Sequence, residues 1–244
     1  MSSLDQKSSS ATSTAPPNLT KGIIQRGLQV VAILLLYGVI LFLSAGRLDW
    51  PAAWYFLAID AMVILVNSAI LLRRDPAFIA ARGGLGQDAK DWDTRVAGVA
   101  GVLMVLGLIV PGLDLRFRWS TGFPLLTQLL GFIALITGYV LFSWGMISNR
   151  FFETKVRIQT DRGHTVATAG PYRCIRHPGY VGMILQLLGT PLALASWWGI
   201  IPALGAVIAF IIRTALEDRT LQRELPGYSA YAQRVRYRLL PGIW

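Results

Sequence analysis

Residues 123–147 read FPLLTQLLGFIALITGYVLFSWGMI, an apolar stretch without a charged side chain. A helix needs about 20 residues to cross the hydrocarbon core of a bilayer, so this stretch is long enough to span it. A run this continuous favours a helix, because the strands of a membrane barrel alternate apolar and polar side chains. The stretch therefore predicts a membrane-spanning helix.

Further apolar stretches lie on both sides of this one. They cover residues 28–45, 52–72, 96–113, 180–195 and 198–212. The last two are shorter and are joined by a Ser-Trp-Trp turn, so we expect a hairpin that is tilted or only partly inserted. We predict an all-α integral membrane protein with about six hydrophobic helices, a cytoplasmic loop before the hairpin and a C-terminal helix after it.

The composition agrees with a membrane protein. Apolar residues make up 54% of the chain and charged residues 15%, whereas a typical soluble domain carries roughly 25% charged residues. The net charge of +10 also suits a nucleic-acid binder, but such a domain presents its basic patch on a water-soluble body. Here the basic residues lie between apolar stretches, so we expect membrane lipid and no nucleic acid as a partner.

The basic residues also predict the orientation in the membrane. Of the 23 Lys and Arg residues, only Arg47, Arg116 and Arg118 fall on one side of six successive crossings. Basic residues are enriched in cytoplasmic loops, so we expect a multi-pass protein with both termini in the cytoplasm. Residues 1–20 are rich in Ser and Thr and lack an apolar core, which predicts a disordered tail and not a secretory signal.

Reactive side chains concentrate in the last part of the chain. Residues 21–147 supply N-terminal transmembrane helices, whereas residues 148–244 hold both histidines and the only cysteine. One cysteine excludes an internal disulfide, and two histidines without a third ligand motif predict no metal site. We therefore expect residues 148–244 to contain a cofactor-binding loop, the membrane hairpin and a C-terminal cytoplasmic segment.

The motif GPYRCIRHPGYVG covers residues 170–182. Proline has a fixed φ and no N–H, so Pro178 suits the first turn of a helix. The free N–H groups of that turn, with Arg176 and His177 just before it, would attract an anion such as a carboxylate. The alternative is a basic loop that contacts only lipid head groups.

A second polar cluster begins where the last apolar stretch ends. Arg213 and Glu217 lie four residues apart and therefore share a helical face. Arginine suits a carboxylate ligand, but an i,i+4 ion pair with a snorkelling arginine explains the same pattern. The tail at residues 224–238 is amphipathic and basic, so it either lies on an anionic leaflet or folds back over the loop.

Together these motifs resemble the isoprenylcysteine carboxyl methyltransferase family. That family consists of integral membrane enzymes that use S-adenosylmethionine and are related to phospholipid N-methyltransferases. The resemblance covers residues 148–244 and rests on the Arg-His-Pro-x-Tyr-x-Gly core at residues 176–182, followed by Arg213 and an acidic pair. Family members usually have two glutamates there, and this chain has Glu217 followed by Asp218.

The resemblance implies S-adenosylmethionine as cofactor, held at the cytoplasmic membrane surface. By matching position, the residues that would line the cofactor pocket are Gln159, His164, Tyr172, His177, Tyr180 and Gly182. We also expect Arg176 to bind the cofactor, because it lies at the predicted anion site before Pro178. Arg213 and Glu217 would be the catalytic residues that face a lipophilic or small-molecule acceptor. A carboxylate acceptor needs no general base, whereas a thiol or a lipid amine would lose a proton to Glu217.

Two other functions fit parts of the sequence. A membrane reductase of the sterol type, which uses NADPH, has a similar C-terminal half. Its motif generally has Asn before the Tyr and an acid after the Gly, where this chain has Gly179 and Met183. A non-enzymatic transporter would use Asp60, an acid within an apolar stretch. The structural alternative for Asp60 is a pairing with a polar neighbour such as Asn67.

Overall fold

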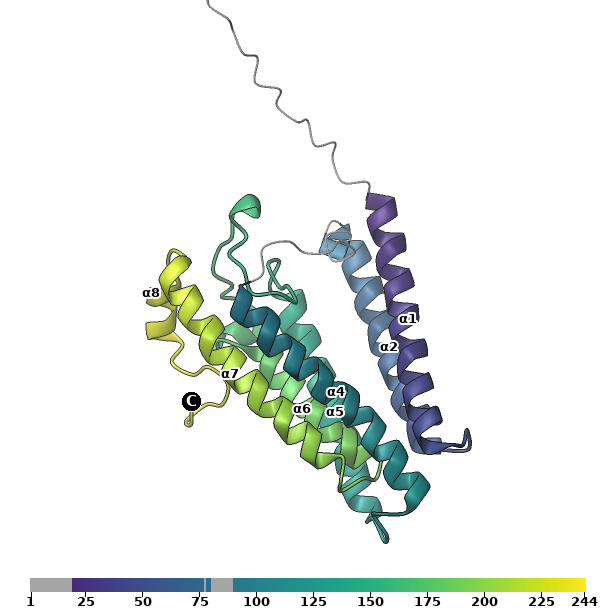
Figure 1. Ribbon diagram of the computed structural model, residues 1–244. Coiled ribbons are helices and arrows are strands. Elements are labelled where there is room, and N and C mark those ends of the chain that lie inside the picture. The colour runs from purple at the N-terminus through teal and green to yellow at the C-terminus, as the bar shows by residue number, and fades with distance from the viewer. Residues whose placement is uncertain (1–18, 77, 80–89) are drawn as a thin grey trace, which may run out of the picture.

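The computed structural model describes residues 19–76, 78–79 and 90–244 (Figure 1). The tail predicted for residues 1–20 falls outside this range except for Leu19 and Thr20, which already belong to the first helix. Within the described ranges the secondary structure is helical and contains no strand.

The described part of the chain forms seven α-helices. These are α1 (Leu19–Ala45), α2 (Pro51–Arg74), α4 (Asp91–Phe117), α5 (Leu125–Ile147), α6 (Pro178–Ala193), α7 (Ile200–Glu224) and α8 (Tyr228–Arg234). Two 3-10 turns, η1 (Thr160–Arg162) and η2 (Gly170–Arg173), lie in the long loop between α5 and α6. The prediction of about six hydrophobic helices followed by a short C-terminal helix is confirmed.

Five of these helices, α1, α2, α4, α5 and α7, are long and apolar enough to cross a membrane. The outward faces are apolar as well: the Leu43 side chain on α1 is 74% exposed and that of Met62 on α2 is 67% exposed. Apolar side chains in such numbers on the outside of a protein favour a lipid environment over water. The chain is a multi-pass membrane protein.

Helix α6 begins at Pro178, as predicted, and its 16 residues make it the shorter arm of the α6–α7 hairpin. The long loop before α6 and helix α8 lie at the end of the bundle where α4 begins (Figure 1). The start of α4 contacts both neighbours: Lys90 pairs with Glu224 of α7 at 2.8 Å, and its backbone N–H donates to Val156 of the loop. This end of the bundle holds most of the predicted site.

Glycines let α5 and α6 approach each other closely. A Cβ added at Gly138 would come within 2.6 Å of the Gly182 carbonyl oxygen, and a Cβ at Gly182 would meet the Gly138 carbonyl oxygen at 2.6 Å. Gly189 lies equally close to α5, since a Cβ there would lie 2.8 Å from the Gly131 carbonyl oxygen. Small residues at helix contacts are typical of membrane proteins, in which van der Waals packing holds helices together.

We expect Gly182→Ala to lower the free energy of unfolding by about 1–3 kcal/mol, because the methyl group would overpack a contact with backbone atoms. Unfolding in detergent, followed by circular dichroism, measures the change. Gly107→Ala on α4 is the matched control, since a Cβ at Gly107 meets nothing within 4 Å. Equal stability of the two variants would contradict the close approach of α5 and α6.

Two buried acids in the membrane helices have hydrogen-bond partners from other parts of the chain. Asp60 accepts a hydrogen bond from the Tyr139 hydroxyl on α5. Asn67, which the sequence suggested as the partner of Asp60, donates instead to Ser143 at 2.8 Å. The partner expected for Asp60 was therefore wrong, because the nearest polar group in three dimensions comes from another helix. Asp114, near the end of α4, accepts a hydrogen bond from Ser196 in the α6–α7 turn.

Candidate functional site

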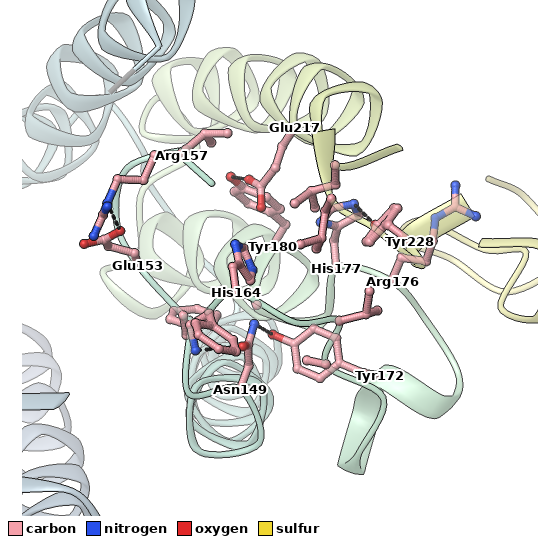
Figure 2. Close-up of a pocket in the computed structure, with 18 of the residues that line it drawn as sticks. Asn149, Glu153, Arg157, His164, Tyr172, Arg176, His177, Tyr180, Glu217 and Tyr228 are labelled. Carbon is pink, nitrogen blue, oxygen red and sulfur yellow. Dashed lines mark hydrogen bonds and ion pairs between the residues drawn. The ribbon is translucent and has the colours of Figure 1, made fainter. Parts of the chain in front are cut away.

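A cavity of about 180 Å³ lies at the loop end of the bundle. Its walls come from the end of α5, the α5–α6 loop, the start of α6, the last turns of α7 and helix α8. Figure 2 shows His164, Tyr180 and Glu217 around the same space, although they come from the loop, α6 and α7.

Eight of the predicted site residues line this cavity. They are Gln159, His164, Tyr172, Arg176, His177, Tyr180, Arg213 and Glu217. Gly182 does not line it, and the structure places this residue against the backbone of α5 instead. The resemblance implied that Gly182 lines the cofactor pocket, and the structure does not support this role. The missing side chain of Gly182 makes room for the backbone of α5 and not for a ligand.

A buried carboxylate, Asp218 on α7, collects hydrogen bonds behind the cavity wall. Arg176 donates to both of its oxygens, from Nε at 2.8 Å and from Nη2 at 3.0 Å. Arg238 donates at 2.8 Å and the Tyr228 hydroxyl at 3.0 Å. His177 Nε2 lies 3.2 Å from the same carboxylate. Asp218 on α7 thus joins the loop just before α6, helix α8 and the C-terminal segment, and it does not itself line the cavity.

The C-terminal segment covers the start of α6. The backbone N–H of Arg176 donates to the Tyr237 carbonyl oxygen at 2.9 Å, and that of His177 donates to the Arg238 carbonyl oxygen at 3.0 Å. Arg176 Nη1 also donates to the Val235 carbonyl oxygen at 2.9 Å. The backbone N–H groups just before Pro178 therefore bind the chain's own carbonyl oxygens, and the anion site expected at the first turn of α6 stays a prediction. Of the two arrangements considered for the tail, the structure has the fold-back.

Arg213 and Glu217, the predicted catalytic residues, do not form an i,i+4 ion pair with each other. Arg213 Nε donates to Asp93 of α4 at 2.6 Å, and Arg213 Nη2 donates to the Thr154 carbonyl oxygen at 2.6 Å. The guanidinium lies 5.8 Å from the centre of the Tyr180 ring. The Tyr180 hydroxyl donates to Glu217, so each member of the pair has its own partner. Sequence reasoning missed Asp93, because nothing local connects it to Arg213.

Hydrogen bonds hold the loop wall of the cavity. Gln159 Nε2 donates to the Phe151 carbonyl oxygen at 2.7 Å, and Arg162 donates to Gln159 Oε1 at 2.9 Å. The His164 ring lies 4.6 Å from the Phe151 ring, measured between centres. Burial lowers the pKa of His164, and the positive charge of Arg157 lowers it further, so the imidazole is neutral near pH 7. Gln159 and Arg162 therefore shape the loop wall.

Three tyrosines, Tyr172, Tyr228 and Tyr231, form a further part of the cavity wall. The Tyr231 hydroxyl donates to the Tyr172 carbonyl oxygen at 2.7 Å, which joins α8 to the loop. Burial raises the pKa of Tyr231 to about 12, and it also raises the pKa of Tyr172 and of Tyr228. The hydroxyls therefore stay protonated at neutral pH and present uncharged aromatic faces to the cavity.

Comparisons with known proteins match the part of the chain that forms most of this cavity. Residues 126–226 match the family model described as phospholipid methyltransferase. A rice protein (Oryza sativa subsp. indica), "Probable protein-S-isoprenylcysteine O-methyltransferase", is 28% identical over 108 residues, which cover 43% of this chain and 56% of the relative. "Protein-S-isoprenylcysteine O-methyltransferase B" of Arabidopsis thaliana is 28% identical over 127 residues, covering 51% of this chain and 61% of that protein.

The chain spans about half the length of the curated relatives it matches. The family model covers α5, the loop, α6 and α7, and these elements carry all the predicted site residues. Helices α1, α2 and α4 lie outside it. The resemblance found in the motifs is confirmed: residues 126–226 match the phospholipid methyltransferase model, and the similar plant proteins are named protein-S-isoprenylcysteine O-methyltransferases.

Proposed function

We propose that this protein is a membrane methyltransferase that uses S-adenosylmethionine and acts on a lipophilic acceptor, with a prenylated cysteine carboxylate as the favoured class. One observation carries the proposal: His177, Tyr180 and Arg213, from the loop, α6 and α7, line one cavity. The cavity faces the side of the membrane that the distribution of basic residues assigns to the cytoplasm, together with both termini.

The chemistry of the lining residues fits S-adenosylmethionine. A sulfonium cation is attracted to an aromatic face, which Tyr180 provides. The amino acid end of the cofactor carries both charges, and the cavity offers the carboxylate of Glu217 and the guanidinium of Arg157. An adenosine ring needs apolar surface, which Leu221 and Leu225 supply. When bound, this cofactor supplies a methyl group on a positively charged sulfur.

The chain's own contribution is alignment of the acceptor and exclusion of water, because methyl transfer is an in-line displacement. Arg213 Nε and Nη2 are engaged, while among the described residues Nη1 has no hydrogen-bond partner. Nη1 would donate to an acceptor carboxylate and orient it. A carboxylate needs no general base, which agrees with a Glu217 that already accepts a hydrogen bond from Tyr180.

The lipophilic part of the acceptor has an apolar wall on the membrane side of the cavity. Phe142, Met183 and Phe210 line it there, from α5, α6 and α7. These side chains bury hydrocarbon favourably, which supports an acceptor that arrives from the lipid with its reactive group foremost.

We expect Tyr180→Ala to weaken the binding of S-adenosylmethionine at least tenfold, because a desolvated cation–π contact contributes about 2 kcal/mol. Tyr180→Phe keeps the aromatic face and should bind within about threefold of the wild type. Isothermal titration calorimetry of the full chain in detergent measures both affinities. Tyr55→Ala on α2 is the control, since Tyr55 is 63% exposed and does not line the cavity.

The same titration tests the competing functions. The wild type should bind S-adenosylmethionine and should not bind NADPH. Binding of NADPH alone would support the reductase, and binding of neither would defeat the methyltransferase proposal.

A further inference from the structure

A five-residue segment of the loop lies along the rim of the cavity. All of its residues, Glu153–Arg157, line the cavity, and we call this segment the strap. Few backbone hydrogen bonds hold it, because it has no regular secondary structure. Its position depends on side chains that come from the membrane helices.

Asp93, in the first turn of α4, supplies one of these side chains. Asp93 is 1% exposed, and its two oxygens have different partners. Oδ1 accepts the Arg213 Nε hydrogen bond at 2.6 Å, and Oδ2 accepts the Val156 backbone N–H at 2.8 Å. One buried carboxylate therefore binds both the predicted catalytic arginine and the strap.

These contacts close a ring through three elements. Arg213 Nη2 donates to the Thr154 carbonyl oxygen at 2.6 Å, so the arginine reaches the strap directly as well as through Asp93. The same guanidinium lies over Tyr180, whose hydroxyl donates to Glu217. The contacts run from Asp93 on α4 to Glu217, which lines the cavity.

We propose that Asp93 is a positioning residue, which fixes the Arg213 guanidinium and holds the strap over the acceptor end of the cavity. The inference rests on the proposed function, and it extends the site to α4, outside residues 126–226 that match the family model. Asp93 does not line the cavity, so it acts through Arg213 and the strap.

An asparagine at position 93 tests whether Asp93 acts through its charge and hydrogen bonds or only by filling space. Asparagine has nearly the shape of aspartate, but it offers one acceptor oxygen and one donor nitrogen. Two N–H donors converge on the carboxylate, from Arg213 and Val156. In either orientation, Asp93→Asn therefore loses one of the two hydrogen bonds and removes the countercharge of Arg213.

The test uses the purified full chain with N-acetyl-S-farnesylcysteine as the acceptor probe. In Asp93→Asn we expect the KM for the probe to rise about tenfold or more, as the loss of a charged hydrogen bond predicts. The Kd for S-adenosylmethionine should rise less than the KM for the probe, because Arg157 is the only one of its assigned contacts that belongs to the strap. Asp91→Asn, an exposed acid on the same turn of α4, is the matched control and should behave as the wild type.

Hydrogen–deuterium exchange reports on the strap independently of activity. The Val156 amide should exchange faster in Asp93→Asn and at the wild-type rate in Asp91→Asn. Asp93→Glu keeps the charge but moves the carboxylate by one methylene, so it should fold and show a smaller change in the same direction. It replaces Asp93→Asn in every measurement where the asparagine variant does not fold.

The inference fails if Asp93→Asn, or Asp93→Glu in its place, has the wild-type KM and wild-type exchange at Val156. Failure of the proposed function looks different, because the wild type itself would then bind no S-adenosylmethionine or transfer no methyl group to the probe. In that case the exchange at Val156 still decides whether Asp93 holds the strap.

Discussion

Arg213→Lys is expected to lower kcat/KM for methyl transfer by about 100-fold or more, because a lysine cannot replace the planar fork of arginine. Three nitrogens of Arg213 are available, and two of them bind Asp93 and the Thr154 carbonyl oxygen. A lysine has a single nitrogen, so it cannot bind Asp93, the Thr154 carbonyl oxygen and the acceptor carboxylate in the same way. We therefore expect the substitution to leave the acceptor without its orienting group, and misalignment of about 1 Å can cost roughly 100-fold in rate.

The loss is measured with labelled S-adenosylmethionine and N-acetyl-S-farnesylcysteine, and the Kd for S-adenosylmethionine is measured in parallel. Arg219→Lys, an exposed position on the same helix, is the matched control and should retain the wild-type rate. The double variant Asp93→Asn with Arg213→Gln removes the buried charge pair together. It should remain folded and inactive, which separates the loss of the arginine from the cost of leaving Asp93 unpaired.

Arg213→Lys with nearly wild-type kcat/KM would contradict the assignment of Arg213 as the acceptor-facing residue. A parallel loss of S-adenosylmethionine affinity would place the arginine on the cofactor instead.

Asp218→Asn is expected to lower the free energy of unfolding by about 3–5 kcal/mol, because it removes the negative charge that a buried cluster of cations shares. Arg176 and Arg238 both donate to this carboxylate, and the side chain of Asp218 is fully buried. The asparagine nitrogen would in addition meet N–H donors where the native oxygen accepts them. The result should be release of the C-terminal segment from the start of α6.

Chemical unfolding in detergent measures the loss, and limited trypsin digestion at Arg234 and Arg236 reports on the released segment. Glu224→Gln is the matched control on the same helix, because its ion pair with Lys90 is partly exposed and should contribute about 1 kcal/mol or less. If Asp218→Asn and Glu224→Gln are equally stable and equally resistant to trypsin, Asp218 is not the centre of this network.

Asp218 lies in a different environment from its neighbour Glu217. Members of the family that the motifs resemble usually have a second glutamate at this position, where this chain has an aspartate. Asp218 faces away from the cavity, toward Arg176 and the C-terminal segment. In this chain the two neighbouring acids have separate tasks, because successive residues of a helix point in different directions.

Apolar run length was enough to predict the membrane helices, because the bilayer imposes a minimum length and requires backbone hydrogen bonds within each segment. A proline at the first turn predicted where α6 begins, and the motifs named eight of the residues that line the cavity. These features are local, so they can be recognised without knowing what lies beside them in space.

Long-range pairing was decided only by the tertiary structure. Asp93 and Arg213 are 120 positions apart and share a hydrogen bond at 2.6 Å. Arg176, which we expected to bind an anionic ligand, donates hydrogen bonds to Asp218 of the chain itself. Gly182 faces another backbone and not the cavity. The physical reason is that a buried charge is stable only beside its partner, and which partner reaches it depends on how the helices pack.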